Sequence, residues 1–209
     1  MKRKAIKNSQ NFTVYNMTNI AIMSIIIAIC SWISIPSVVP FTMQLFGVFL
    51  ATLMLGGRDG SLSILLYIIL GAIGLPVFSG FQAGLSHIVG PTGGYIIGFL
   101  LIGLLYYMNE KLCKGEGNTK DITSSVPKAL SNKMHTQKHQ RGSIITLLIG
   151  LLLCYLFGTL WFILVSTKNG TEYGFINVLA ICVFPYIIPD ITKLWLAILV
   201  SKRLKSRIR

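Results

Sequence analysis

The chain has 209 residues, of which 53% are hydrophobic and only 12% are charged, and its mean hydropathy is +0.70. This composition excludes an ordinary soluble domain and is typical of a membrane protein. In such a protein we interpret the formal net charge of +13 as a signal of topology and of attraction to anionic membrane lipids, rather than of nucleic-acid binding.

Two long stretches of the chain, 8–57 and 60–109, contain no charged residue. Each has about 50 residues, and because one membrane-spanning helix needs about 20 residues, each stretch holds two spans. Prolines and glycines mark the turns, near Pro36 in the first stretch and between Gly71 and Gly94 in the second. With two further apolar segments, the sequence predicts a single all-α integral membrane domain, residues 1–209, with six transmembrane helices at about 18–36, 41–56, 61–75, 92–110, 143–166 and 189–203.

Basic residues are distributed unevenly around these spans. Of the 19 Lys and Arg residues, 17 lie before span one, between spans two and three, between spans four and five, or after span six. Since positive residues concentrate on the cytoplasmic side, both termini are predicted to be cytoplasmic. The segment 111–142, rich in Lys, Ser, Thr and Asn, is predicted to be a flexible basic cytoplasmic loop. The N-terminal apolar run leads directly into another span, so we interpret it as a membrane helix rather than a signal peptide.

The sequence offers little for catalysis or metal binding. The four cysteines lack the spacing of metal or redox motifs, and His135 and His139 have no accompanying carboxylate or cysteine. The phosphate-binding pattern G-x-x-x-x-G-K-[ST] is absent from the sequence, so the chain is not expected to bind ATP by itself. Without clustered acid and base residues in the apolar segments, we expect no enzyme activity, no metal and no cofactor.

Asp190 and Lys193 interrupt an apolar segment. They lie three residues apart in "PYIIPDITKLWLAIL", residues 185–199, and therefore share one face of a helix. Pro189 suits the first turn of that helix, which places both side chains in the outer half of the membrane. Two interpretations stay open. The pair is either an internal ion pair with a structural role, or part of a cavity open to the outside that suits a small molecule with a polar head and an acid group.

Three motifs carry a resemblance to a known family. They are "VPFTMQLFGVFLATLMLGGRDGSLSILLYIILGAIGLPVFSG" at 39–80, "GPTGGYIIGF" at 90–99 and "FPYIIPDITK" at 184–193. Together they closely resemble the BioY family, the biotin-specific substrate-binding subunits of energy-coupling-factor (ECF) transporters of the cell membrane. The resemblance implies six membrane helices and a biotin cavity open to the outside. It also implies three partner subunits, a transmembrane coupling protein and two ABC-type ATPases, which agrees with the missing phosphate-binding pattern.

The same resemblance implies which residues contact biotin. Asp190 and Lys193 match the family's late Asp-x-x-Lys; from charge alone, Asp190 suits the ureido N–H groups and Lys193 the valerate carboxylate. The loop 74–94 is expected to line or cover the cavity. The other site residues implied are Gln44, Ser79, Gly80, Gln82 and Tyr95, where Gln82 lies close to the position at which some relatives carry an amide.

Small residues in span one are a further, partial match to the family. Ala21, Ser24 and Ala28 resemble the spaced alanines with which the family docks on its coupling protein, and helix packing inside this protein is the alternative.

Two other functions remain as alternatives to biotin uptake. One keeps the fold but takes another small anionic vitamin or acid as its ligand. The other is a membrane-embedded enzyme or a non-transport membrane subunit, in which Asp190 and Lys193 form only a structural pair.

Overall fold

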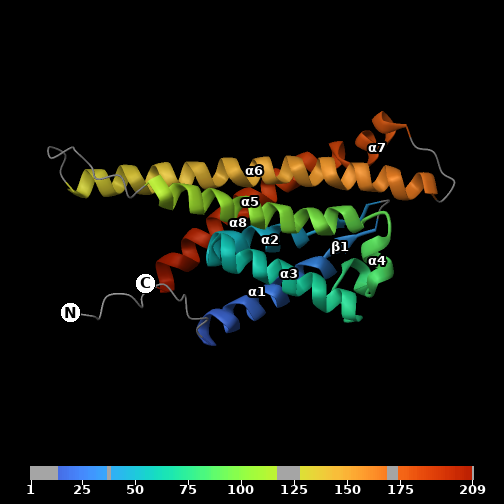
Figure 1. The fold of residues 1–209 in the computed structure, drawn as a ribbon, viewed down its shortest axis with the longest axis horizontal. Helices are drawn as coiled ribbons and strands as arrows, with labels where there is room; N and C mark the ends of the chain where they lie inside the picture. Colours follow the sequence, from blue (N-terminus) through green and yellow to red (C-terminus); the bar gives the residue numbers. More distant parts are fainter. Residues whose placement is uncertain (1–13, 37–38, 117–127, 169–173, 209) are drawn as a thin grey trace, which may run out of the picture.

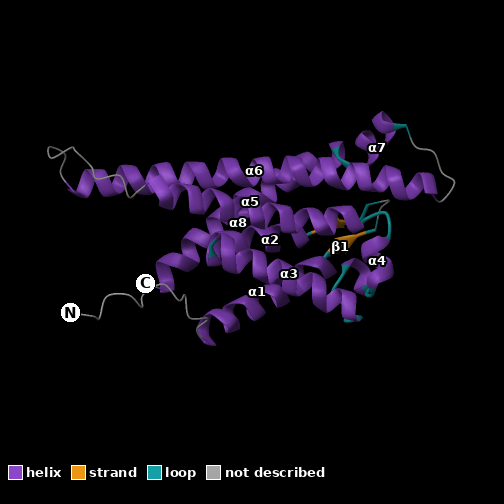
Figure 2. Ribbon diagram, in the orientation of Figure 1, coloured by secondary structure: helices purple, strands orange, loops and turns teal. Residues whose placement is uncertain are grey.

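The computed structural model describes residues 14–36, 39–116, 128–168 and 174–208, and these residues are mostly helical (Figures 1 and 2). The long helices are α1 (Val14–Trp32), α2 (Gln44–Leu55), α3 (Gly57–Ile73), α5 (Gly93–Glu116), α6 (Lys128–Lys168) and α8 (Phe184–Ile208). The short elements are β1 (Ser34–Ile35), β2 (Phe41–Thr42), η1 (Ser79–Phe81), α4 (Leu85–Val89) and α7 (Phe175–Cys182). Strands β1 and β2 pair antiparallel.

Within the described ranges, four helical segments are long and apolar enough to cross a membrane: Val14–Trp32, Gly93–Cys113, Gly142–Lys168 and Phe184–Arg207. Helices α2 and α3 are shorter, with 12 and 17 residues. At 1.5 Å per residue they measure about 18 and 26 Å, less than the roughly 30 Å of a hydrocarbon core. The four long segments confirm a mostly helical membrane protein, while the number of six spans stays a prediction, because α2 and α3 are shorter than the hydrocarbon core.

Helix α2 is the centre of the bundle, and α1, α3, α5 and α8 all pack against it. Its residues Val48, Phe49 and Ala51 have no exposed surface. Gly60 of α3 lies so close to Thr52 that an added Cβ would be 2.8 Å from the Thr52 Cα atom. This close approach fixes α2 and α3 as a tight helical hairpin.

The turn of that hairpin differs in position from the prediction. Helix α3 begins at Gly57, and a single residue, Gly56, joins it to α2 with a left-handed φ of +86°. The Glu110 carboxylate of α5 accepts the backbone N–H of Gly57 at 2.8 Å. Because this tertiary contact satisfies the first turn of α3, the helix starts before the predicted boundary at residue 61.

The connection between α5 and α6 also differs from the predicted loop 111–142. Helix α5 continues to Glu116 and α6 begins at Lys128, while residues 117–127 lie outside the described part of the chain. Residues 128–141 contain no glycine or proline and are rich in good helix formers, so the helix of the following span extends through them. The side chains of His135 and His139 lie outside the described residues.

Helix α8 begins at Phe184 instead of near residue 189. The segment has two prolines four residues apart, Pro185 and Pro189, and either could stand in a first turn. Pro185 occupies the first turn, where a missing N–H is tolerated. Pro189 lies inside the helix and removes the hydrogen bond to the Pro185 carbonyl. The proline in the first turn of this helix is therefore Pro185, and the prediction that Pro189 has this position is wrong.

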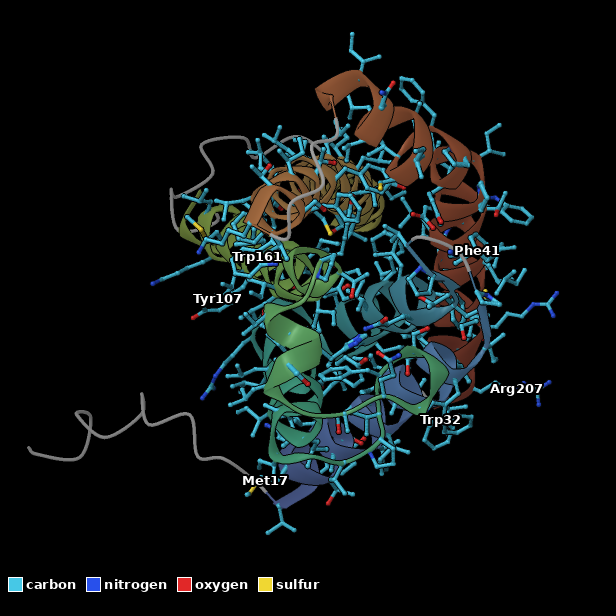
Figure 3. The ribbon with its side chains drawn as sticks, turned by 90° about the vertical axis from the view of Figure 1, so that its right-hand side faces the viewer. Met17, Trp32, Phe41, Tyr107, Trp161 and Arg207 are labelled. Carbon is cyan, nitrogen blue, oxygen red and sulfur yellow. The ribbon has the colours of Figure 1, made fainter. Side chains whose placement is uncertain are left out.

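The small residues of α1 mostly face inward. Ser24 and Ala28 are buried at 2% and 6% exposure, whereas Ala21 is exposed. Since α1 packs on α2 and α3, the structure favours internal packing for Ser24 and Ala28. Figure 3 views the bundle end-on and shows Met17 and Trp32 on its outside.

The loop between α3 and α5 covers one end of the bundle and is fixed by contacts with α1 and α3. Phe78 is fully buried, and its ring fills the space that a Cβ at Gly71 of α3 would occupy. The indole Nε1 of Trp32 donates to the carbonyl oxygen of Pro76 at 2.9 Å. Figure 1 places this loop, with α4, at the end of the molecule opposite the start of α1 and the end of α8.

Candidate functional site

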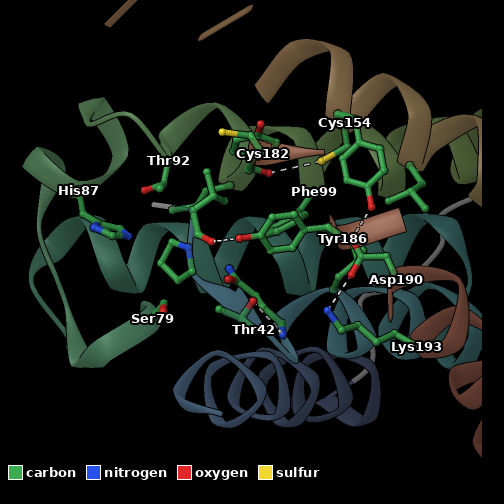
Figure 4. Close-up of a pocket in the computed structure, with 18 residues that line it drawn as sticks. Thr42, Ser79, His87, Thr92, Phe99, Cys154, Cys182, Tyr186, Asp190 and Lys193 are labelled. Atoms are coloured by element: carbon green, nitrogen blue, oxygen red, sulfur yellow. Dashed lines mark hydrogen bonds and ion pairs between the residues drawn. The ribbon is translucent and has the colours of Figure 1, made fainter. Parts of the chain in front are cut away.

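A cavity lies among α2, α5, α6 and α8, next to the loop that joins α3 to α5 (Figure 4). Most of its walls are apolar or aromatic, with a few polar side chains between them, as in typical small-molecule sites. Of the seven predicted site residues, those that line it are Gln44, Ser79, Tyr95, Asp190 and Lys193. The sequence therefore predicted residues from four separate segments that the fold brings together.

Gly80 and Gln82 are not among the described residues that line the cavity. Gly80 and Phe81 both adopt left-handed backbone conformations, with φ of +68° and +59°, and the Phe81 ring stacks on Trp32 at a centroid distance of 5.2 Å. This turn leaves Gln82 exposed, where it lines an adjoining groove beside His87. Nearness in sequence to Ser79 was thus a poor guide to their position.

Asp190 and Lys193 form a buried ion pair on α8. The Lys193 ammonium donates to Asp190 Oδ1 at 2.7 Å, and both residues are only 5% exposed. The Tyr155 hydroxyl of α6 donates to the other carboxylate oxygen, Oδ2, at 2.5 Å. Because both carboxylate oxygens accept a hydrogen bond, the buried charge is well compensated.

An aromatic ring also contacts the Lys193 ammonium group. Lys193 Nζ lies 4.0 Å from the centroid of the Phe41 ring, a cation–π contact. Phe41 also stacks on Tyr186 at 6.0 Å, and the Tyr186 hydroxyl donates to the backbone carbonyl of Val39. The segment that contains β2 is thereby attached to α8 directly beside the ion pair.

Gln44 and Tyr95 are buried polar residues with defined partners. Gln44, at the start of α2, donates from Nε2 to the Tyr67 hydroxyl at 2.8 Å, which leaves its amide oxygen available as an acceptor. The Tyr95 hydroxyl lies 3.4 Å from Thr159 Oγ1 on α6. These hydrogen bonds position both side chains in the cavity wall, and neither bond involves Asp190 or Lys193.

Sequence analysis missed several lining residues, among them Tyr155, Tyr186, His87 and Thr92. Tyr155 is an isolated tyrosine in an apolar span, and no spacing rule connects it to Asp190, which is 35 positions away. His87 has no other histidine, cysteine or acidic residue near it in the sequence, so no motif indicates a role for it. Their assignment depends on tertiary contacts, which a single sequence does not display. In the described part of the chain, no group of three or more potential metal ligands occurs.

Comparison with known proteins identifies the family. A model of the BioY family matches residues 2–209. The chain belongs to the BioY family. The resemblance seen in the three motifs is therefore confirmed, and it extends well beyond them over nearly the whole chain.

Two relatives of this BioY-family chain match it over more than 80% of their own length. It is 38% identical over 168 residues to the "Probable biotin transporter BioY" of Pyrococcus horikoshii, covering 80% of this chain and 82% of that protein. It is 32% identical over 194 residues to the "Biotin transporter BioY2" of Lactococcus lactis, covering 92% and 89%. The fold is similar, with a TM-score of 0.69 and 25% identity over 97% of this chain, to a crystal structure of the S-component for biotin from an ECF-type ABC transporter.

Proposed function

We propose that this chain is a biotin-binding subunit of an ECF transporter, which captures biotin from outside the cell and delivers it inward. The observation that carries the proposal is the buried Asp190–Lys193 pair, which lines a cavity between the helices of a BioY-family fold. The protein is a multi-pass protein of the cell membrane, and its function is transport rather than catalysis. The alternative of a membrane-embedded enzyme finds no support in its relatives, which are biotin transporters.

The proposed topology has six membrane helices, formed by α1, α2, α3, α5, the apolar part of α6, and α8, with both termini in the cytoplasm. The start of α1 and the end of α8 lie at the same end of the molecule (Figure 1). The contact between Gly57 and Glu110 brings the α2–α3 turn, with Arg58, to the end of α5. Basic residues of these segments thus gather at one end, which supports its cytoplasmic orientation. The opposite end, with the loop over the cavity, faces outward.

Both members of the ion pair meet the same end of biotin in this proposal. Lys193 Nζ lies 2.7 Å from Asp190 Oδ1, whereas the valerate chain separates the ureido ring of biotin from its carboxylate. The two side chains are therefore too close together to bind the two ends of biotin separately. The ureido ring presents N–H donors beside a carbonyl acceptor, which suits a carboxylate beside an ammonium group. The expectation that Lys193 binds the carboxylate is disfavoured, because a second carboxylate there would face Asp190 in a buried site.

The proposed partners follow from what the chain lacks and what it resembles. The sequence has no phosphate-binding loop, so an external module must supply the energy of ATP hydrolysis. We assign this role to a transmembrane coupling protein and two ABC-type ATPases, as the similarity to an ECF-type S-component implies. Membrane lipids surround the exposed apolar faces of the helices. We assign no nucleic-acid partner to the chain.

The test is calorimetry of biotin with the purified, detergent-solubilised protein, with other vitamins as controls. We expect one-to-one binding of biotin alone and weaker binding by Asp190→Asn, which keeps the shape of the side chain but removes its charge. Binding of a different anionic vitamin in place of biotin would contradict the assignment of biotin as the ligand. It would favour the alternative in which the same fold takes another small anionic vitamin or acid. Absence of any binding by a folded sample would favour a structural role for the pair.

A double exchange, Asp190→Lys with Lys193→Asp, separates the structural alternative from ligand binding. The mutual hydrogen bond of 2.7 Å is what a purely structural pair requires, so thermal stability should survive the exchange if that were its only role. Because Tyr155 donates to Asp190 and Phe41 faces Lys193, we expect the exchange to abolish biotin binding. Unchanged binding would remove the pair from the site.

A further inference from the structure

We infer that His87, together with the hydroxyl groups of Thr92 and Ser79, binds the carboxylate of the ligand at the end of the cavity opposite Asp190 and Lys193. This inference rests on the proposed function, because it concerns the same cavity and the same ligand. It goes further by assigning the acid group of the ligand to a residue outside the family motifs that the sequence displayed.

A ligand carboxylate finds no free cation at the end of the cavity formed by Asp190 and Lys193, which we call the inner end. Lys193 is the only Lys or Arg among the described residues that line the cavity, and Asp190 already holds its ammonium group at 2.7 Å. A carboxylate placed there would compete with Asp190 and create an uncompensated buried negative charge. The acid group of an anionic ligand must therefore lie elsewhere.

His87 lies where the other end of the ligand would be. It lines the cavity together with Thr92 and Ser79, and Figure 4 shows these three side chains on the side away from Asp190 and Lys193. His87 also lines the adjoining groove with Thr92. It is the only described histidine at the cavity, and it is half-buried. A ligand lying between the two ends would have its chain against the apolar walls.

The His87 ring is held in a fixed position. It stacks on the Phe78 ring at a centroid distance of 5.1 Å and an interplanar angle of 23°. Phe78 is fully buried, contacts Tyr67 edge to face at 5.6 Å, and occupies the space beside Gly71. The ring therefore needs little reorganisation to meet a ligand, which favours binding.

Three donors are free for the carboxylate. Within the described part of the chain, the side chains of His87, Thr92 and Ser79 make no hydrogen bond to another residue. Burial lowers the pKa of His87, so the empty site presents a neutral imidazole with one N–H donor. A bound carboxylate favours the protonated ring, which would add charge to this hydrogen bond.

The experiment compares biotin with biotinamide, in which a neutral carboxamide replaces the carboxylate. We expect His87→Ala to weaken biotin binding about tenfold or more, the scale of a lost charge-assisted hydrogen bond. Biotinamide binding should weaken clearly less, because its neutral carboxamide oxygen accepts only an ordinary hydrogen bond from the ring. His87→Gln, which retains an N–H donor in a smaller side chain, should lose less affinity. Val89→Ala, at an exposed position of the same short helix that lines neither the cavity nor the adjoining groove, is the matched control and should bind both ligands as the unaltered protein does.

Three outcomes would overturn the inference. In the first, His87→Ala binds biotin as well as the unaltered protein. In the second, His87→Ala and His87→Gln lose biotin and biotinamide affinity equally, which indicates a general change in the loop. In the third, the unaltered protein binds neither ligand, which contradicts the proposed function itself. Thermal unfolding of each variant shows whether it is folded, so these outcomes are distinguishable.

Discussion

The two ends of the cavity differ in how completely their polar groups are paired. At the inner end, both oxygens of Asp190 accept hydrogen bonds, and Lys193 has a carboxylate and an aromatic face as partners. At the opposite end, here called the outer end, the His87 ring is positioned by its stacking on Phe78. The side chains of His87, Thr92 and Ser79 make no hydrogen bond to another residue in the described part of the chain. The inner end is a preorganised hydrogen-bond network, whereas the outer end has side-chain donors that remain available for a ligand.

The difference teaches how one cavity can hold a neutral ring and an anion. A paired acid and base provide an acceptor and a donor without net charge, which suits a ureido group. Unpaired donors near the surface suit a carboxylate, because they attract negative charge without a buried cation. We therefore expect changes at the inner end to affect folding and binding together, and changes at the outer end to affect mainly binding.

Asp190→Ala should have the largest effect. It leaves the Lys193 ammonium buried without its partner, and breaking a buried pair in this way costs about 3–5 kcal/mol. We expect loss of biotin binding and a lower thermal unfolding temperature, measured by calorimetry and by unfolding in detergent. The double variant Asp190→Ala with Lys193→Ala removes both charges and should recover part of the stability without binding. A single variant as stable as the unaltered protein would show that the pair contributes little to folding.

Gly71→Ala tests the support of the outer end. The added methyl group would overlap the Phe78 ring, so the ring and the stacked His87 must move. Overpacking of this kind costs about 1–3 kcal/mol, and we expect weaker biotin binding with a moderate loss of stability. Combining it with Phe78→Leu, which replaces the flat ring with a shorter side chain, should restore part of the stability but not the position of His87. Unchanged biotin binding by Gly71→Ala would show that the positions of Phe78 and His87 in the loop do not matter for the ligand.

Tyr155→Phe removes one hydroxyl from the inner network and no apolar surface. Asp190 Oδ2 then loses a hydrogen bond of 2.5 Å, and a hydrogen bond to a charged group contributes about 1.5–3 kcal/mol. The effect on binding should lie near the low end of this range, because Lys193 still pairs with Oδ1. Calorimetry of biotin and biotinamide should show equal losses, in contrast to the His87 variants. A loss confined to biotin would place the carboxylate at the inner end and reverse our assignment of the two ends.

The two ends also differ in how far the sequence could predict them. Asp190 and Lys193 were predictable because charge is rare in an apolar segment, and the motifs around Gln44, Ser79 and Tyr95 carried the family resemblance. The helical membrane architecture followed from the two charge-free stretches. The start of α8 was not predictable, since either Pro185 or Pro189 suits a first turn. The roles of Tyr155 and His87 depend on partners far away in the sequence.

Gln82→Ala should have the smallest effect on stability and binding, and it tests whether Gln82 belongs to the outer end of the cavity. Its sequence position predicts a ligand contact, but the left-handed turn at Gly80 and Phe81 directs it away from the cavity lining. Gln82→Ala changes an exposed side chain, so we expect stability and biotin affinity to stay within about 0.5 kcal/mol of the unaltered protein. Calorimetry measures the affinity directly. A tenfold loss would mean that the loop rearranges around the ligand and brings Gln82 inward, because Gln82 is exposed and does not line the cavity.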